Sequence, residues 1–200
     1  MKVELHREPS VFETLRDEWN ALLEKSVTRV PFLRAEYQRA WWRQRGGGEW
    51  PEASLLVATA RAEGGELLGI APLFFAKNRD GRPALLLVGS IEISDYLDFV
   101  VTRPQAEAVC AALLDCLNGP DAPAWEVLDF YNIPESSPTR AALGRAASAR
   151  EERATGRTRQ AAKAPCASSN SAVSRRAGRM VAKAHAYPRR RNGQGSGRFT

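Results

Sequence analysis

Apolar residues recur every three or four positions near the start of the chain, which is the period of a helix. A short strand, "VELH", comes first, and then Ser10 and Glu13 have the spacing of a capping box. The apolar positions that follow predict one helix with a single buried face. They are Phe12, Leu15, Trp19, Leu22 and Leu23. A second helix is predicted over 31–48, beginning at Pro31 and ending in three glycines.

The period changes to two after position 53, which is typical of strands. Three strand-like runs cover 54–61, 66–77 and 84–89, and Asp80-Gly81 predicts a tight hairpin between the last two. The pattern then predicts a strand over 95–101, a helix over 104–119, a strand over 124–133, and a helix that starts with Ser137 before Pro138. This order indicates an α/β fold with a mixed sheet.

The stretch "GSIEISDYLDFVV", from Gly89 to Val101, combines a strand-like pattern with three carboxylates and a phenol. Alternation over 95–101 puts Leu97, Phe99 and Val101 on the core face. The other face receives Tyr96, Asp98 and Val100. We therefore expect Asp98 to share a wet, concave side with Tyr96.

The last quarter of the chain differs from the rest. Residues 1–150 hold 17 Lys and Arg against 21 Asp and Glu, a net charge of −4, whereas residues 151–200 hold 12 against 2, a net of +10. Residues 151–200 contain no Leu, Ile or Trp. Such a segment buries too little apolar surface to offset its backbone entropy, so we predict a folded domain over 1–150 and a disordered, basic, low-complexity tail over 151–200.

Several classes of site are disfavoured by composition. The chain has only His6 and His185, which argues against a His-based metal site or a Ser-His-Asp triad, and no metal cofactor is expected. Its three cysteines, at positions 110, 116 and 166, fit no zinc spacing and indicate reduced thiols. No secretory signal or membrane-spanning run is found, so we expect a cytoplasmic protein.

Three motifs together resemble the GNAT superfamily of acyltransferases, in the branch of CelD-like cellulose-biosynthesis and FemAB-like proteins. "WNALLEKSVTRVPFLRAEYQRAWWRQRG" is similar to the family's opening, and "LLVATARAEGGELLGIAPLFF" is similar to its strand pair ending in Pro-Leu. "LLLVGSIEISDYLDFVV" resembles its strand with "DY-x-D". The resemblance covers residues 1 to about 150.

This resemblance implies a GNAT-like, largely antiparallel sheet flanked by helices. It also implies transfer of an acyl group from acetyl-coenzyme A to an amine, on a small molecule or on a polysaccharide or peptidoglycan precursor. Family members continue into a second half that carries the acyl-coenzyme A site. We therefore expect a fold that is incomplete on its C-terminal side, in a chain that is truncated or out of frame after position 150. The sequence leaves open whether the chain is active without that second half.

Four residues are candidates for the site. Where the resemblance places them, Asp95 and Tyr96 would orient an amine or act as acid and base, and Asp98 would bind substrate on the same side. The alternative is that Asp95 caps a turn and Tyr96 packs with a wet hydroxyl. Trp41 is expected in the core, and Trp42 is expected to be partly exposed, with a substrate cleft as its functional role.

Two other hypotheses concern the tail. Arg190, Gly193 and Gly195 have the R-x-x-G-x-G spacing that holds the coenzyme A pyrophosphate in the resembled family, but no helix can follow them, which disfavours a small complete acyltransferase. The rival to an acyltransferase is a non-catalytic α/β module with a basic arm. Such an arm would make nonspecific, salt-sensitive contacts with nucleic acid or another anionic surface.

Overall fold

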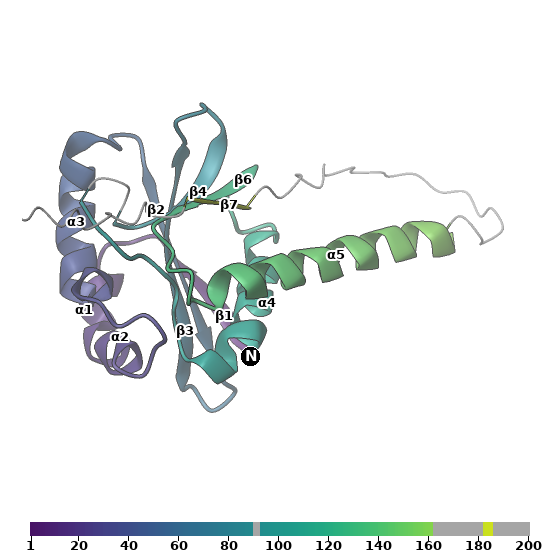
Figure 1. Cartoon of the computed structure of the whole chain (residues 1–200), viewed down its shortest axis with the longest axis horizontal. Helices are drawn as coiled ribbons and strands as arrows, with labels where there is room; N and C mark the ends of the chain where they lie inside the picture. Colours follow the sequence, from purple (N-terminus) through teal and green to yellow (C-terminus); the bar gives the residue numbers. More distant parts are fainter. Residues whose placement is uncertain (90–92, 162–181, 186–200) are drawn as a thin grey trace, which may run out of the picture.

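The computed structural model describes residues 1–89, 93–161 and 182–185 as a sheet between two helical layers (Figure 1). The strands are β1 (Lys2–His6), β2 (Ser54–Arg61), β3 (Leu67–Lys77), β4 (Pro83–Leu87), β5 (Val100–Val101), β6 (Val127–Tyr131) and β7 (Ala182–His185). The helices are α1 (Val11–Thr14), α2 (Arg16–Leu23), α3 (Ala35–Gly48), α4 (Ala106–Leu117) and α5 (Thr139–Ala161). Two short 3-10 helices are η1 (Pro31–Leu33) and η2 (Arg103–Gln105).

The sheet is open and mostly antiparallel, as predicted. Its order is β1-β2-β3-β4-β6-β7, and β5 pairs with β3 beside this path. The pairs from β1 to β4 are antiparallel, whereas β4–β6 and β6–β7 are parallel. The hairpin between β3 and β4 turns at Asp80-Gly81, and Gly81 adopts a φ of 73°, which confirms that prediction.

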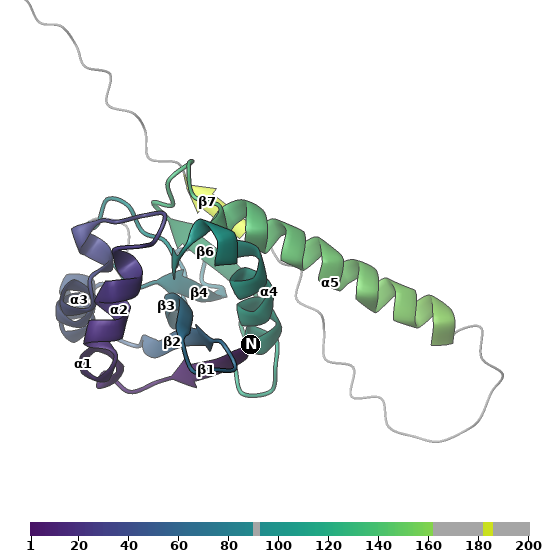
Figure 2. The same cartoon turned by 90° about the horizontal axis from the view of Figure 1, so that it is seen from below.

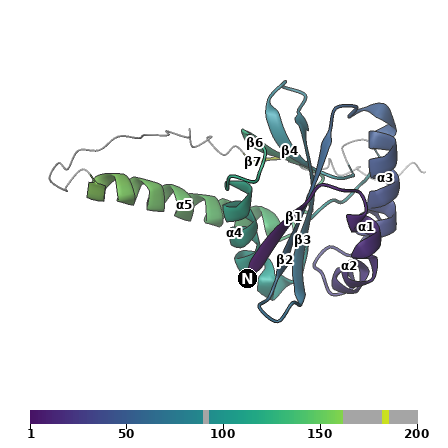
Figure 3. The ribbon, with the colours of Figure 1, turned by 180° about the vertical axis from the view of Figure 1, so that it is seen from behind.

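Helices cover both faces of the sheet. α1, α2 and α3 form one layer, and α4 with the start of α5 forms the other, as Figures 2 and 3 show from two further sides. An aromatic cluster joins α3 to the sheet, because Phe74 of β3 lies 5.6 Å from Trp41, 6.2 Å from Trp42 and 5.4 Å from Trp50, measured between ring centroids. Burying each such side chain contributes about 1.5–3 kcal/mol, so this cluster is a main anchor of the first layer.

The start of the first predicted helix differs from the capping-box prediction. The helix is broken at Leu15 into α1 and α2, and Ser10 makes no side-chain capping hydrogen bond. Ser10 has helical backbone angles itself, with φ −57° and ψ −19°, so its hydroxyl does not reach the free N–H groups. Glu13 instead pairs with Arg39 of α3 at 2.6 Å.

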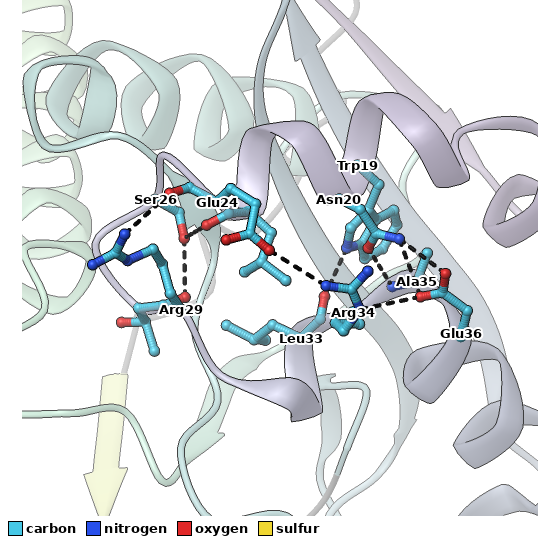
Figure 4. A network of polar contacts seen from close by, with 11 residues as sticks. Trp19, Asn20, Glu24, Ser26, Arg29, Leu33, Arg34, Ala35 and Glu36 are labelled. Carbon is cyan, nitrogen blue, oxygen red and sulfur yellow. Dashed lines mark hydrogen bonds and ion pairs between the residues drawn. The ribbon is translucent and has the colours of Figure 1, made fainter.

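A polar network fixes the start of α3 on α2 (Figure 4). Arg34 stands at the N-cap position without a capping bond, and the Asn20 side chain supplies the acceptor, taking a hydrogen bond from the Ala35 N–H at 3.2 Å. The same amide donates to both oxygens of Glu36 at 3.0 and 3.1 Å. Trp19 donates its indole N–H to the Leu33 carbonyl at 2.7 Å. The entry of α3 is therefore set by side chains of the preceding helix.

The last helix runs further than the predicted domain boundary at position 150. Of residues 151–200, the structure describes 151–161, which continue α5, and 182–185, which form β7. β7 pairs with β6 from Leu128 with Ala182 to Tyr131 with His185. The division of the chain at 150, and a fold incomplete on its C-terminal side, stay predictions. The start of α5 is as expected, because Ser137 Oγ accepts a hydrogen bond from the Thr139 N–H at 3.1 Å.

The Asn20 cap yields a stability prediction. Asn20→Ala removes the acceptor for the Ala35 N–H and should lower the free energy of unfolding by about 1 kcal/mol, the usual cost of losing a helix cap. Urea unfolding followed by circular dichroism measures this. Gln44→Ala, which removes an exposed amide far from the start of α3, should change stability little. Equal losses in the two variants would contradict the capping role.

Candidate functional site

The stretch that carries Asp95 and Tyr96 is a loop between two strands that share one neighbour. β4 pairs with β3 at residues 73–77, and β5 pairs with β3 at Gly69 and Ile70. The chain thus leaves the edge of β3 after β4 and returns to it at β5. We call residues 93–99 the return loop. The predicted strand over 95–101 is wrong except for Val100 and Val101.

A glycine allows this departure. Gly89 has a φ of 128°, and a Cβ at this position would lie 2.4 Å from Leu97 Cδ2. Just before it, the Val88 N–H donates to the Pro72 carbonyl at 2.8 Å, which keeps the chain on β3 until the turn. A side chain at position 89 would therefore push the return loop away from the sheet.

Hydrogen bonds hold the return loop at the end of β6 and on α3. The Ser94 hydroxyl donates to the Gly89 carbonyl at 2.7 Å, so it accepts from the Tyr37 hydroxyl, 2.8 Å away. The Asn132 amide donates to the Ser94 carbonyl at 2.7 Å, and the Leu97 N–H donates to the Asn132 carbonyl at 3.0 Å. Asn132 has a φ of 61°, a left-handed conformation that Asn tolerates. The return loop is thus fixed to two separate elements.

The return loop lies at the carboxyl ends of the parallel strands β4 and β6. Their register pairs Ala84 with Val127 and Leu85 with Leu128. β4 continues to Leu87 and β6 to Tyr131 without further mutual pairs. In open α/β sheets, ligands bind outside the carboxyl ends of parallel strands. This end of the sheet is therefore the candidate site.

Asp95 and Tyr96 are exposed at this end. Tyr96 is 47% exposed, so it is not enclosed by aliphatic side chains. Asp95 is exposed as well. Both side chains are accessible to a ligand, and their roles stay predictions.

Asp98 does not lie on a wet side with Tyr96, which corrects the prediction from alternation. It is 1% exposed and accepts hydrogen bonds from the Thr28 hydroxyl at 2.7 Å and from the Phe99 N–H at 2.8 Å. Burial raises the pKa of Asp98, while hydrogen bonding, including that from the Thr28 hydroxyl, opposes that shift. In this position the carboxylate ties the return loop to the segment before α3, and it is closed to a substrate.

Both faces of the chain around Asp98 are buried, which explains the error. Leu97, Phe99 and Val101 are in the core as predicted, but Val100 on the other face is fully buried too. The segment after α2 lies against this part of the chain, because the Thr28 hydroxyl donates to Asp98 and the Val27 N–H donates to the Val101 carbonyl at 3.1 Å. Alternation identifies a wet face only where one side of a strand meets solvent.

Trp42 is separated from Asp95 and Tyr96. It is 3% exposed, so its predicted partial exposure is wrong, whereas Trp41 at 5% is in the core as expected. Trp42 lines a cavity that includes none of the return loop. The structure therefore does not place the four candidates in one site.

Several polar residues of the site region had no clear sequence signal. Tyr37 belongs to the apolar face of a predicted helix, and Thr28 lies between two predicted helices. Ser94 stands at the entry to the predicted strand over 95–101, and Asn132 falls inside the predicted strand over 124–133. Gln38 is fully buried and donates to the carbonyls of Phe32 and Val88 at 2.7 and 2.9 Å, which fixes the end of β4. Only Asn132, two residues before Pro134, carried a turn signal.

Other reactive groups give no further catalytic candidate near the loop. Burial, and secondarily the charge of Asp98, raise the pKa of Cys110 to about 12, so this residue stays a thiol at neutral pH. In the described ranges, no three His, Cys, Asp or Glu side chains are grouped so as to hold a metal ion. None of the described helices is long and apolar enough to cross a membrane.

Comparison with known proteins adds no relative. No protein-family model matches the chain, and neither a curated protein nor a solved structure matches it.

The buried Asp98 carboxylate yields a pH prediction. Because its pKa is raised on folding, its contribution to stability is full below the unfolded pKa of about 3.9 and is lost as the pH rises through the folded pKa. Asp98→Asn keeps an acceptor without the charge. Its stability relative to the unmodified protein should therefore rise from pH 4 to pH 8, as measured by urea unfolding.

Two further variants make this test specific. Asp98→Ala leaves the Thr28 hydroxyl and the Phe99 N–H without their acceptor and should cost about 1–3 kcal/mol for each donor that stays buried. Asp95→Asn, at an exposed position, should show no such pH trend. Parallel stability curves for Asp98→Asn and the unmodified protein would refute the buried-charge interpretation.

Proposed function

We propose that the chain belongs to an N-acyltransferase of the GNAT type, which transfers an acetyl group from acetyl-coenzyme A to an amine. The observation that carries this proposal is the parallel pair β4–β6. Its strands share two register pairs and continue beyond them without further pairing, and Asp95 and Tyr96 are exposed on the loop at that end. A co-substrate at this end of the sheet would meet a carboxylate and a phenol.

These two groups suit the chemistry of acyl transfer. The amine nitrogen forms an amide bond with the acetyl carbon while the thioester C–S bond breaks, and the amine's proton finally rests on the departing thiol. In our proposal Asp95 accepts the proton from the amine, Tyr96 donates a proton to the sulfur, and Asp95 then returns its proton to Tyr96 through solvent, so that both groups are restored. Asp98 takes no direct part, since it is buried and bonded to Thr28.

The acceptor remains defined only by class. An amine on a small molecule, or on a polysaccharide or peptidoglycan precursor, follows from the family resemblance. The exposure of Asp95 and Tyr96 is compatible with a large acceptor, because both lie on the surface and not inside a closed cavity.

The acyltransferase proposal predicts a specific loss of turnover. The full chain should bind acetyl-coenzyme A in calorimetry and release free thiol with an amine acceptor, screened over amino sugars, polyamines and lysyl peptides. Asp95→Asn and Tyr96→Phe should each lower kcat about 100-fold or more, the range for general acid–base groups, without lowering Tm.

A matched control is Glu135→Gln, which neutralises an exposed carboxylate in the segment after β6. It should leave kcat unchanged. The proposal fails if the full chain does not bind acetyl-coenzyme A, or if the two loop variants keep full turnover.

A second candidate function rests on charge. Residues 151–200 carry a net charge of +10, and α5 extends past the body of the protein into this segment (Figure 1). The alternative proposal is a non-catalytic α/β module whose basic arm binds nucleic acid through its phosphates. Arg190, Gly193 and Gly195 lie outside the described residues, so their coenzyme A spacing supports neither candidate.

The arm hypothesis predicts salt-dependent binding. Fluorescence anisotropy with a DNA duplex should show affinity that falls steeply with salt. Replacing Arg189, Arg190, Arg191 and Arg198 by Gln should reduce the slope of log affinity against log salt by up to about 3–4, since each phosphate contact contributes about 0.9. An unchanged slope, or no binding by the unmodified chain, would reject the arm.

A further inference from the structure

A cavity of about 630 Å³ lies at the end of the sheet where β4 begins, away from the return loop. Ser54 and Leu55 at the start of β2 and Phe75 of β3 form part of its wall. Ser54 pairs with Phe75, and Ala84 at the start of β4 pairs with the next residue of β3, Ala76. The volume is within the range of about 300–1,000 Å³ that small-molecule sites occupy.

The edge of the sheet is open at this cavity. β1 ends at His6, which pairs with Val57, so Ser54, Leu55 and Leu56 have β3 on one side and no described strand on the other. The segment 121–123 and Pro9 complete the wall in place of a strand. The cavity is therefore a gap in the fold and not a space between packed layers.

Two guanidinium groups line the cavity without a carboxylate partner. Arg45 lies with its central carbon 3.6 Å from the centroid of the Trp42 ring and donates to the Trp42 carbonyl at 2.8 Å. Arg7 donates to the backbone carbonyl of Asp121. In the part of the chain that the structure describes, neither guanidinium forms an ion pair. Most of the N–H donors of each remain available to a ligand.

The backbone holds Arg45 in an unfavourable conformation. Its φ of 48° and ψ of 44° are left-handed, and the three glycines that follow also have positive φ values. A glycine alone at the end of α3 would make the turn without this strain. In this conformation the Arg45 guanidinium lies over the Trp42 ring and lines the cavity, and partial burial lowers its pKa.

The other residues that line the cavity indicate which kind of anion it would bind. Leu55, Phe75 and Pro123 give the cavity apolar walls, and the outer plane of the Arg45 guanidinium can stack on a flat group. Asp121 adds one negative charge against the two positive charges of Arg7 and Arg45. A net charge of one fits a monoanionic carboxylate better than a dianionic phosphate.

From this arrangement we infer that the cavity is a binding site for a small organic carboxylate with a flat apolar body. Arg45 and Arg7 hold the carboxylate, and the apolar walls at Leu55, Phe75 and Pro123 contact the body. The inference is independent of acyl transfer at the return loop, since the two regions share no lining residue.

To test this inference, the full chain is titrated with 2-naphthoate, and binding is measured by calorimetry and by ligand-observed NMR. We expect saturable one-site binding, with little binding of the neutral analogue 2-naphthalenemethanol and weaker binding of 2-naphthyl phosphate. Arg45→Gln and Arg7→Gln should each weaken naphthoate binding about 10- to 100-fold, the usual effect of removing a hydrogen bond to a charged group.

Arg45→Gly separates binding from folding. Glycine accepts the left-handed backbone at position 45, so Tm should be maintained while naphthoate binding is lost. Arg43→Gln removes an exposed guanidinium of the same helix that does not line the cavity, and should leave binding unchanged. Equal effects of the Arg43 and Arg45 variants, equal binding of the neutral analogue, or no saturable binding of naphthoate would each overturn the inference.

Discussion

β2 pairs with one edge of β3, and two strands, β4 and β5, share the opposite edge. β4 pairs with residues 73–77 and β5 with Gly69 and Ile70, so the chain between them must leave the sheet and come back. The return loop therefore lies at the carboxyl end of β4. Hydrogen bonds of Ser94 fix this loop to Asn132, which follows β6, and to Tyr37 of α3. The loop of the candidate site is formed because β4 and β5 pair with different parts of the same edge of β3.

The buried carboxylate of Asp98 holds the return loop in place through hydrogen bonds, but burying this group has an unfavourable desolvation free energy. Transferring a charged group out of water is unfavourable unless hydrogen bonds replace its hydration, and here hydroxyl and backbone donors from different parts of the chain do so. Thr28 lies in the segment between α2 and α3. Its hydrogen bond to Asp98 therefore joins the first helical layer to the chain just before it rejoins β3.

The two ends of the sheet offer different chemistry. The end beyond β4 presents the exposed carboxylate of Asp95 and the exposed phenol of Tyr96 on a loop that hydrogen bonds hold in place. The end where β2 begins presents two guanidinium groups over apolar walls, which suits an anion. α3 connects them, since Tyr37 near its start bonds the return loop and Trp42 near its end lines the cavity.

Local sequence determined the elements whose signals are local. The strand over 54–61, the Asp80-Gly81 hairpin and the Ser137 cap follow from alternation, turn chemistry and capping, because neighbouring residues alone decide them. The burial of the Asp98 and Trp42 side chains depends on contacts with residues far away in the sequence, which no local pattern contains. Thr28 reaches Asp98 across 70 positions, and helical layers on both faces of the sheet remove the wet side that alternation assumes. Only the tertiary structure decided which polar side chains are buried and which are exposed, because burial depends on what packs opposite a residue and not on its neighbours in sequence.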